Sequence, residues 1–366
     1  MLRIRTSSGC LCPKSRRVAP PPTLCASRER EGLPCRDRLQ RKSIALGGVA
    51  GERTSAGRLL VALALLLVLC GCGGAPNQVA SIRIRHTRVW RVLPDRARIP
   101  APRGVALGLE GEVYLLDTAA RVQVYGPDGE VRRHWRMPES EVGSPEDLTA
   151  LPDGRIVVPD THYHRVITFD RDGVELARFG EFGRELGQFI YPVCAVVDDE
   201  GNMFVCEYGS NDRIQKFTPD GVPLLAFGGF GTEPGRFQRP SGMVWLDGRL
   251  YVADAANNRV QVFSGDGGFV GVMTDPSGLS PALRFPYDIT LGPEGRLLVV
   301  EWGGGRVTEL SRDGTVLGRY GTAGAGDGQF STPWGIECDS SGGGRIWVAD
   351  TGNRRLVVLD REGDRG

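Results

Sequence analysis

The sequence is poor in the residues on which several common enzyme classes depend. Its 366 residues include only four histidines, and its three lysines are Lys14, Lys42 and Lys216. No Ser-His-Asp arrangement, phosphate-binding loop or dinucleotide fingerprint can be recognised in it. The longest apolar run, residues 59–69, has 11 residues, whereas a membrane-spanning helix needs about 20. The sequence therefore gives no sign of a nucleotide-dependent enzyme, and its apolar run is too short to span a bilayer.

Charge is distributed unevenly along the chain. The formal net charge is +1, but residues 1–71 hold 13 Lys and Arg against 4 Asp and Glu, while residues 72–366 hold 32 against 40. An acidic main body argues against binding to the phosphate backbone of a nucleic acid. The chain is 40% hydrophobic, which is enough for a large core. Its 52 glycines and 24 prolines follow no collagen period and therefore favour a fold rich in turns.

The apolar run 59–69 has the length of the hydrophobic part of a secretory signal. The residues after it resemble the lipobox of bacterial lipoproteins, with Leu69 three positions before Cys72 and the small Gly71 immediately before it. This resemblance implies lipidation of Cys72 and a protein anchored in the cell envelope, on the periplasmic or extracellular side. Cys70 offers a competing register, and a plain secreted or buried apolar segment is the alternative to a lipid anchor.

Residues 1–48 do not fit a folded domain. They are rich in Arg, Pro and Cys and have no hydrophobic period, and a signal peptide is not expected 58 residues into a chain. We interpret them as a disordered extension or as a translated upstream stretch, with the true start near Val49. On this interpretation residues 49–72 are the signal peptide, and residues 73–101 are a linker and one strand.

Residues 102–366 repeat one motif six times. A proline opens each unit, an acidic residue ends a β-rich run, and an arginine follows, with 43 to 49 residues between equivalent positions. The prolines are Pro102, Pro145, Pro192, Pro240, Pro286 and Pro333. The acidic residues are Asp117, Asp160, Glu207, Asp254, Glu301 and Asp350. The arginines are Arg121, Arg165, Arg213, Arg259, Arg306 and Arg355. Because separate markers keep the same period, the repeat is structural.

Each unit contains short apolar runs separated by Asp-Gly or Gly turns, which predicts four antiparallel strands. Six such units predict an all-β fold, a six-bladed β-propeller with four-stranded antiparallel blades. The sixth unit ends after its third strand, because only six residues follow position 360. Residues 81–92 alternate between apolar and basic side chains, so we expect them to pair with residues 355–360 and to close the ring.

Three of the units resemble NHL repeats. The residues that carry the resemblance are 187–192 (GQFIYP), 235–240 (GRFQRP) and 328–333 (GQFSTP), followed by acid-to-arginine loops such as 254–259 (DAANNR). The resemblance covers about residues 102–363 and is weaker in units one, two and five. It implies the propeller fold, but it implies little about function, because one fold carries many activities.

One face of the propeller carries the loops that lead into the first strand of each blade, and a ligand site is expected there. We predict its residues from the positions on this face where one unit differs from the others. Six copies of one acid–arginine pair favour structural links between loops and blades, whereas a ligand site is usually asymmetric. Where three units have glycine two positions after the opening proline, the other three have larger groups, and two acidic markers are followed by aromatic residues. The predicted ligand-binding residues are Asp147, His162, His164, Cys194, Glu207, Tyr208, Asp288, Glu301, Trp302 and Trp334.

We therefore expect a monomeric, membrane-anchored binding module for a protein, a peptide or a glycan at the cell surface, without nucleic acid. No cofactor is expected. The alternative is a metal-dependent lyase or lactonase, activities found in other six-bladed propellers. Its metal would be calcium held by Asp147, Asp288, Glu207 and Glu301, or zinc held in part by the two loop histidines. Cys194 and Cys206 flank one turn, so they form either a disulfide or two buried thiols.

Overall fold

The structure is a computed structural model that describes residues 80–278, 280–340 and 343–362. The chain divides between Gly73 and Gly74, and all the described residues belong to the second unit. The predictions for residues 1–48, for the signal 49–72 and for lipidation of Cys72 lie outside the described residues.

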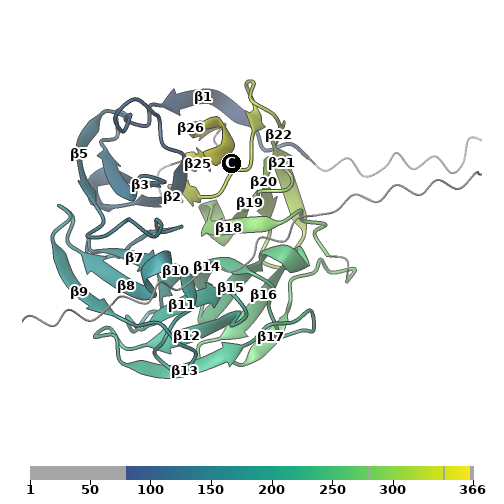
Figure 1. Cartoon of the computed structure of the whole chain (residues 1–366). Helices are drawn as coiled ribbons and strands as arrows, with labels where there is room; N and C mark the ends of the chain where they lie inside the picture. Colours follow the sequence, from purple (N-terminus) through teal and green to yellow (C-terminus); the bar gives the residue numbers. More distant parts are fainter. Residues whose placement is uncertain (1–79, 279, 341–342, 363–366) are drawn as a thin grey trace, which may run out of the picture. The chain divides into compact units, whose positions relative to one another are not determined.

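Six four-stranded antiparallel sheets are arranged around a centre (Figure 1). The first blade contains β2 (Pro102–Leu107), β3 (Val113–Asp117), β4 (Arg121–Tyr125) and β5 (Val131–Arg136). The second contains β6 (Thr149–Ala150), β7 (Ile156–Asp160), β8 (Arg165–Phe169) and β9 (Glu175–Phe179). The third contains β10 (Tyr191–Val197), β11 (Met203–Tyr208), β12 (Arg213–Phe217) and β13 (Pro223–Gly228).

The remaining three blades follow the same order from the innermost strand outwards. The fourth contains β14 (Pro240–Leu246), β15 (Arg249–Asp254), β16 (Arg259–Ser264) and β17 (Phe269–Val272). The fifth contains β18 (Pro286–Leu291), β19 (Leu297–Glu301), β20 (Arg306–Leu310) and β21 (Val316–Tyr320). The sixth contains β24 (Ile336–Cys338), β25 (Ile346–Asp350), β26 (Arg355–Arg361) and, outermost, β1 (Ile84–Trp90). The fold is thus the all-β six-bladed propeller that the repeat predicts.

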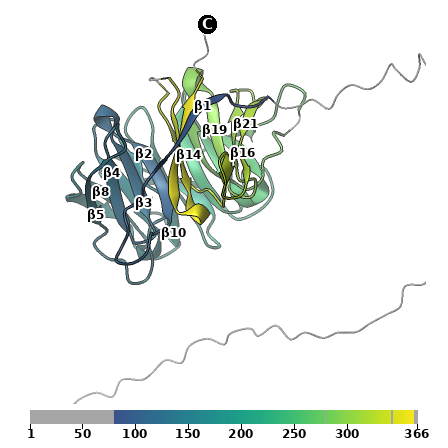
Figure 2. The ribbon, with the colours of Figure 1, turned by 90° about the horizontal axis from the view of Figure 1, so that it is seen from above.

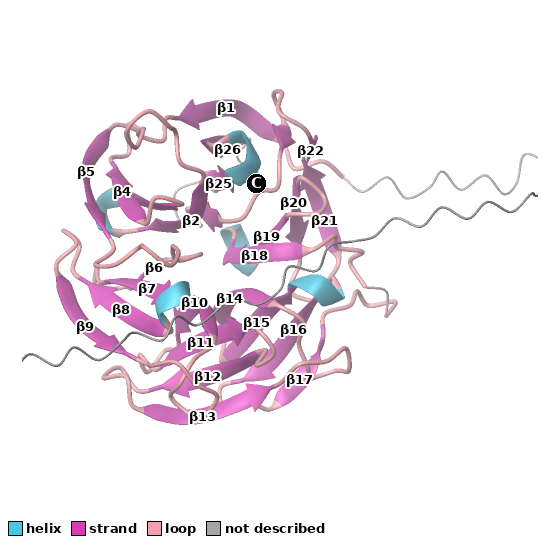
Figure 3. Ribbon diagram, in the orientation of Figure 1, coloured by secondary structure: helices cyan, strands magenta, loops and turns pink. Residues whose placement is uncertain are grey.

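Helices are confined to single 3-10 turns in the described residues (Figure 3). They are η1 (Leu109–Gly111), η2 (Thr161–Tyr163), η3 (Ala255–Asn257), η4 (Pro293–Gly295) and η5 (Thr351–Asn353). No helix in this part of the chain is long and apolar enough to cross a membrane. A small parallel pair, β22 (Thr322–Ala323) and β23 (Gln329–Phe330), lies in the loop between the fifth and sixth blades.

The core consists of six clusters of buried side chains, each between two neighbouring blades. Five of them join consecutive blades from the first to the sixth. The sixth cluster joins the last blade to the first, where Trp347 and Val358 contact Val105 and Leu115. Each sheet therefore buries both of its faces, which explains why its central strands are apolar on both sides.

The outermost strand of the sixth blade comes from the beginning of the described chain. β1 pairs antiparallel with β26, with Thr87 opposite Leu359 and Trp90 opposite Leu356, and it runs along the edge of the blade (Figure 2). The pairing is therefore the one that the alternation in residues 81–92 predicts. Trp90 also belongs to the cluster between the sixth and first blades. That β1 holds the ring closed stays a prediction.

The turns follow the expected chemistry. Asp247 and Gly248 both have positive φ, +50° and +72°, as the two-residue turn of a hairpin between twisted strands requires. At Gly129 the φ is +85° and a side chain would collide with Trp90, so this turn needs glycine for two reasons.

Candidate functional site

Each blade carries one buried ion pair between the acidic residue that ends its second strand and the arginine that begins its third. The six N–O distances lie between 2.7 and 3.0 Å, and all six carboxylates are fully buried. In the fourth blade Asp254 accepts hydrogen bonds from the Gln238 amide at 2.8 Å and from Arg259 at 2.7 Å. Arg259 in turn donates to the carbonyls of Thr232 and Arg236.

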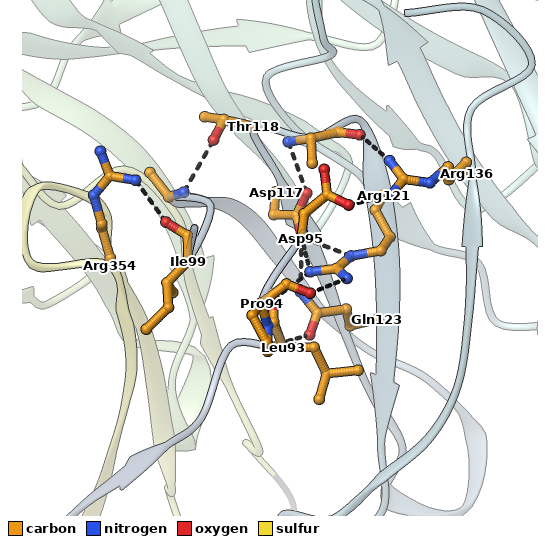
Figure 4. Close-up of polar contacts among 12 residues, drawn as sticks. Leu93, Pro94, Asp95, Ile99, Asp117, Thr118, Arg121, Gln123, Arg136 and Arg354 are labelled. Carbon is orange, nitrogen blue, oxygen red and sulfur yellow. Dashed lines mark hydrogen bonds and ion pairs between the residues drawn. The ribbon is translucent and has the colours of Figure 1, made fainter. Parts of the chain in front are cut away.

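The first blade builds the same link with a different loop. Arg121 binds Asp117 and donates to the carbonyls of Leu93 and Pro94, while Gln123 accepts from the Leu93 amide (Figure 4). In both blades the pair fastens the loop that enters the blade to the blade itself. The geometry is that of a structural link, the role that six copies of one pair favour.

Glu207 and Glu301 belong to these links. Glu207 accepts from the Ile190 amide at 2.6 Å and pairs with Arg213, and burial raises its pKa above the usual range. Glu301 accepts from the Arg284 amide at 2.7 Å and pairs with Arg306. Both side chains have no exposed surface. The structure therefore places these two predicted ligand residues in the links between loop and blade. They lie away from the central channel, around which the six blades are arranged.

Two other predicted carboxylates do meet at the channel. Asp147 and Asp288 line one small cavity of about 10 Å³ near the loop face, together with Glu146, Tyr287 and residues of the other blades: Arg103, Val193, Ser241, Gly242, Trp334 and Gly335. Burial raises the pKa of Asp147 to about 7, and burial together with the negative charge of Asp147 raises that of Asp288 well above its usual range. These groups therefore favour the protonated form.

Glycines make room for these carboxylates. Asp288 accepts hydrogen bonds from the amides of Ile289 and Ile336, at 2.8 and 2.9 Å. Its carboxyl lies over Gly242, where any side chain would collide with it, and Asp147 lies over Gly104 in the same way. The alternation of glycine with larger groups in the repeat therefore has a steric cause.

A polar cover closes the mouth of the channel. Glu146 is buried and accepts hydrogen bonds from the hydroxyls of Tyr208 and Tyr287, at 3.0 and 2.9 Å. Arg239 donates to Glu146 at 3.2 Å and to Tyr287 at 2.8 Å, and its guanidinium lies 4.2 Å from the ring centre of Tyr208. These four residues come from four different blades, so the cover joins the loops across the channel.

Aromatic rings extend this cover into a row across the loop face. On one side the Tyr208 ring lies 5.3 Å from Tyr191, which neighbours His162 and His164, and His164 lies 4.9 Å from Phe182. On the other side Tyr287 stacks on Trp334 at 4.8 Å, and the guanidinium of Arg103 lies 4.7 Å from Trp334.

Trp302 joins the row through Phe285, whose ring lies 5.3 Å from it and 6.3 Å from Tyr287. We call the whole set the ring row: Phe182, His162, His164, Tyr191, Tyr208, Arg239, Tyr287, Trp334, Arg103, Phe285 and Trp302. It contains His162, His164, Tyr208, Trp302 and Trp334 of the predicted site. The predicted site did not include its members Arg103, Arg239, Tyr191, Phe182 and Phe285. A signal was present, because Arg103 and Arg239 adjoin the opening prolines at positions where other units carry different residues.

Cys194 is buried beside the channel and faces Cys206 across β10 and β11. Both thiols are free in the structure, and Cys206 lies 3.0 Å from the Ser241 carbonyl. The structure thus has two buried thiols at this place and no disulfide between them. The hydrogen bond with the Cys206 thiol, together with burial, raises the pKa of Cys194 well above its usual value.

Metal binding finds little support in the described residues. No group of three or more His, Cys, Asp or Glu side chains there could hold an ion. The calcium set of the enzyme alternative is not assembled, because Glu207 and Glu301 are occupied by arginines while Asp147 and Asp288 line the channel. The hypothesis that these four carboxylates bind calcium together is therefore wrong.

Comparison with known proteins agrees with this architecture. The family model described as NHL repeat matches residues 237–263. Human NHL repeat-containing protein 3 is 34% identical over 112 residues, which cover 28% of this chain and 31% of that protein. The human E3 ubiquitin-protein ligase NHLRC1 is 26% identical over 113 residues, covering 31% of this chain and 27% of that protein. The match thus spans about a third of the length of these relatives.

Solved propellers resemble the chain in fold. A streptogramin B lyase structure has a TM-score of 0.55 at 17% identity, covering 76% of this chain and 98% of that one. A putative gluconolactonase has a TM-score of 0.56 at 15% identity, covering 77% and 94%. At such identities the likeness concerns the fold alone. The chain thus matches the NHL-repeat model over residues 237–263 and has the fold of a six-bladed β-propeller.

Proposed function

We propose that this chain is an exported, membrane-anchored propeller whose loop face is a non-catalytic binding site for a protein, a peptide or a glycan. The observation that carries the proposal is the ring row. Its aromatic rings and two guanidiniums cross the loop face, whereas the nearby carboxylates are bound within the links or turned into the channel. A surface of this kind binds by stacking and by donating hydrogen bonds from arginine.

Exposed aromatic side chains on the same loops favour a protein or a peptide among the three. Phe182 and Phe230 are 68% and 64% exposed, and Trp302 is 38% exposed. Large apolar and aromatic groups left in water are typical of interaction surfaces, and aromatic residues and arginine contribute most of the binding energy at protein interfaces.

Equivalent loops of three units show whether folding requires a phenylalanine at the exposed position. Three loops make the same parallel backbone pairing, which joins Phe182 to Phe189, Phe230 to Phe237 and Ala323 to Phe330. Since the third loop adopts this pairing with alanine, the loop does not require phenylalanine at that position. The exposed phenylalanines are therefore better explained by a ligand than by folding.

The enzyme alternative, a metal-dependent lyase or lactonase, has no cluster of metal-binding side chains to support it among the described residues. It would gain support from elemental analysis showing stoichiometric calcium or zinc that is lost in an Asp288→Asn variant. The placement of the protein in the cell envelope rests on the signal-like run 59–69 and on Cys72.

Capture of the partner by the intact protein tests the proposal. Epitope-tagged full-length chains would be isolated after cross-linking in cells, as wild type and as a Phe182→Ser, Phe230→Ser double variant. We expect the double variant to lose the partners that the wild type retains. A Leu176→Ser, Leu224→Ser variant is the matched control, since it removes two exposed apolar side chains from the outer strands of the second and third blades. An equal loss in both variants, or in neither, would contradict a binding site on the loop face.

A further inference from the structure

We propose that a band of arginines along β1 and the loop after it is a docking surface for the anionic headgroups of a lipid membrane. The band consists of six arginines within sixteen residues: Arg83, Arg85, Arg88, Arg91, Arg96 and Arg98. All six are exposed. The proposal concerns a surface separate from the ring row, and the positive charge that carries it is present with or without lipidation at Cys72.

The position of β1 explains the exposure. It is the outermost strand of the sixth blade, so one of its edges has no partner strand, and its residues from 85 to 89 are all exposed. Edge strands often carry charged side chains, which prevent pairing with other chains. That role accounts for Arg85 and Arg88 on the strand but not for Arg91, Arg96 and Arg98, which follow it in the loop of residues 91–101. The band therefore exceeds what protection of an edge requires.

Little of the positive charge is neutralised locally. Arg88 pairs with Asp360 at 2.8 Å. The only acidic residue within the band, Asp95, already pairs with Arg136 at 2.5 Å (Figure 4). Within the described residues the other five arginines of the band have no ion pair. The band thus carries a strong positive charge on a chain whose residues 72–366 are acidic overall.

Three acidic residues adjoin the band besides Asp95 and Asp360, and one of them is already paired: Asp128, Glu130 and Glu362, whose amide donates to the Arg83 carbonyl. Asp128 and Glu130 lie across a groove from Arg88 and Arg91, and Asp128 is already paired with Arg132 at 2.5 Å. Arg354 lies at the other end of the band and donates to the Ile99 carbonyl at 2.5 Å, which adds a positive charge there (Figure 4).

Apolar side chains are interspersed with the arginines. Val89 is 52% exposed and Ile99 is 48% exposed. Basic side chains together with exposed aliphatic ones are the combination that binds at the interface of an anionic bilayer, because headgroups attract the charges and the aliphatic groups leave water.

The surroundings favour a lipid over a nucleic acid or an acidic protein. Arg83 follows Cys72 by 11 positions, so a chain anchored there would keep Arg83, at the start of the band, within about 40 Å of the membrane. An acidic main body would repel a long polyanion that extended beyond the band. Because β1 lies on the perimeter, docking would set the ring edge-on to the membrane and leave the loop face open to a partner from the side.

Vesicle binding tests the proposal with the full chain carrying Cys72→Ala, so that no acyl chain contributes. We expect co-sedimentation with vesicles that contain phosphatidylglycerol, weak binding to vesicles of pure phosphatidylcholine, and loss of binding as salt is raised. Replacing Arg83, Arg85, Arg91 and Arg98 by glutamine should weaken binding about fivefold per arginine, which corresponds to about 1 kcal/mol each.

The matched control replaces four exposed arginines elsewhere by glutamine: Arg155, Arg171, Arg249 and Arg312. It should bind as the unsubstituted chain does, and near-ultraviolet circular dichroism should show that both variants are folded. Equal binding to neutral and anionic vesicles, no binding to either, or equal losses in the two variants would overturn the proposal. Binding to a DNA duplex without binding to anionic vesicles would assign the band to a nucleic acid instead. None of these outcomes bears on partner capture by the loop face.

Discussion

Truncating Trp90 tests whether β1 holds the ring closed. Trp90 is 6% exposed, and its ring lies 5.6 Å from Tyr125 of the first blade and 6.3 Å from Trp347 of the sixth. A buried tryptophan removes about 150–250 Å² from water, which at about 25 cal/mol per Å² is worth about 4–6 kcal/mol. Measured Trp→Ala costs of about 3–5 kcal/mol agree with this value. We therefore expect Trp90→Ala to lower the free energy of unfolding by about 3–5 kcal/mol.

The neighbouring residue provides the control. Val89 lies on the same strand with 52% of its surface exposed, so Val89→Ala should change stability by less than about 0.5 kcal/mol. Urea unfolding of the full chain, followed by near-ultraviolet circular dichroism, would compare the two variants with the wild type. Limited proteolysis within residues 80–101 should become faster for Trp90→Ala alone. If the two variants unfold at the same urea concentration, β1 does not hold the first and sixth blades together.

Three further outcomes are expected. Asp254→Ala should lower the free energy of unfolding in urea by about 3–5 kcal/mol, because it leaves Arg259 without its buried partner. The control variant Asp266→Ala, at an exposed turn, should lower it little. Similar losses of stability in the two variants would contradict the role of the pairs as links. The pKa of Asp147, raised from 3.8 to about 7, means that the folded chain keeps a proton that the unfolded chain has released. Stability should therefore fall as pH rises from about 4 to 7, with a slope of at most about 1.4 kcal/mol per pH unit from this group. Asp147→Asn should flatten this dependence, and an unchanged pH profile of unfolding would refute the assignment. Cys72→Ala should abolish incorporation of labelled palmitate, and a variant that is still labelled and processed would count against lipidation there.

Much of the fold could be predicted from the sequence because it is built from local pairings. Strands that are neighbours in a blade are neighbours in the chain, so turns such as Asp247-Gly248 and the period between the opening prolines define the blades. The link between Asp254 and Arg259 spans five positions, and its repetition in every unit pointed to a structural role. The pairing of β1 with β26 is a distant contact, yet it was predictable, because the sixth unit lacks a strand and residues 81–92 have the alternation of one.

The candidate site could be predicted only in part. The search for departures from the repeat found Asp147, Asp288 and Trp334, which line the channel cavity, and Tyr208 in its cover. The same criterion also selected Glu207 and Glu301, because four units have aspartate at the position that ends the second strand and these two have glutamate, which is one methylene longer. Their carboxylates make the same link as the aspartates of the other blades, with the loop and the arginine adjusted around them.

The sequence by itself determined the number of blades, their strands and turns, and the links that recur in each unit, because these depend on contacts between residues close together in the chain. Only the tertiary structure decided which side chains meet at the centre. Glu146 contacts Arg239, 93 positions away, and Tyr287, 141 positions away. Such contacts arise when the ring brings the same end of every innermost strand to one axis, and a repeat pattern, which treats the units as equivalent, does not specify how their differences combine there.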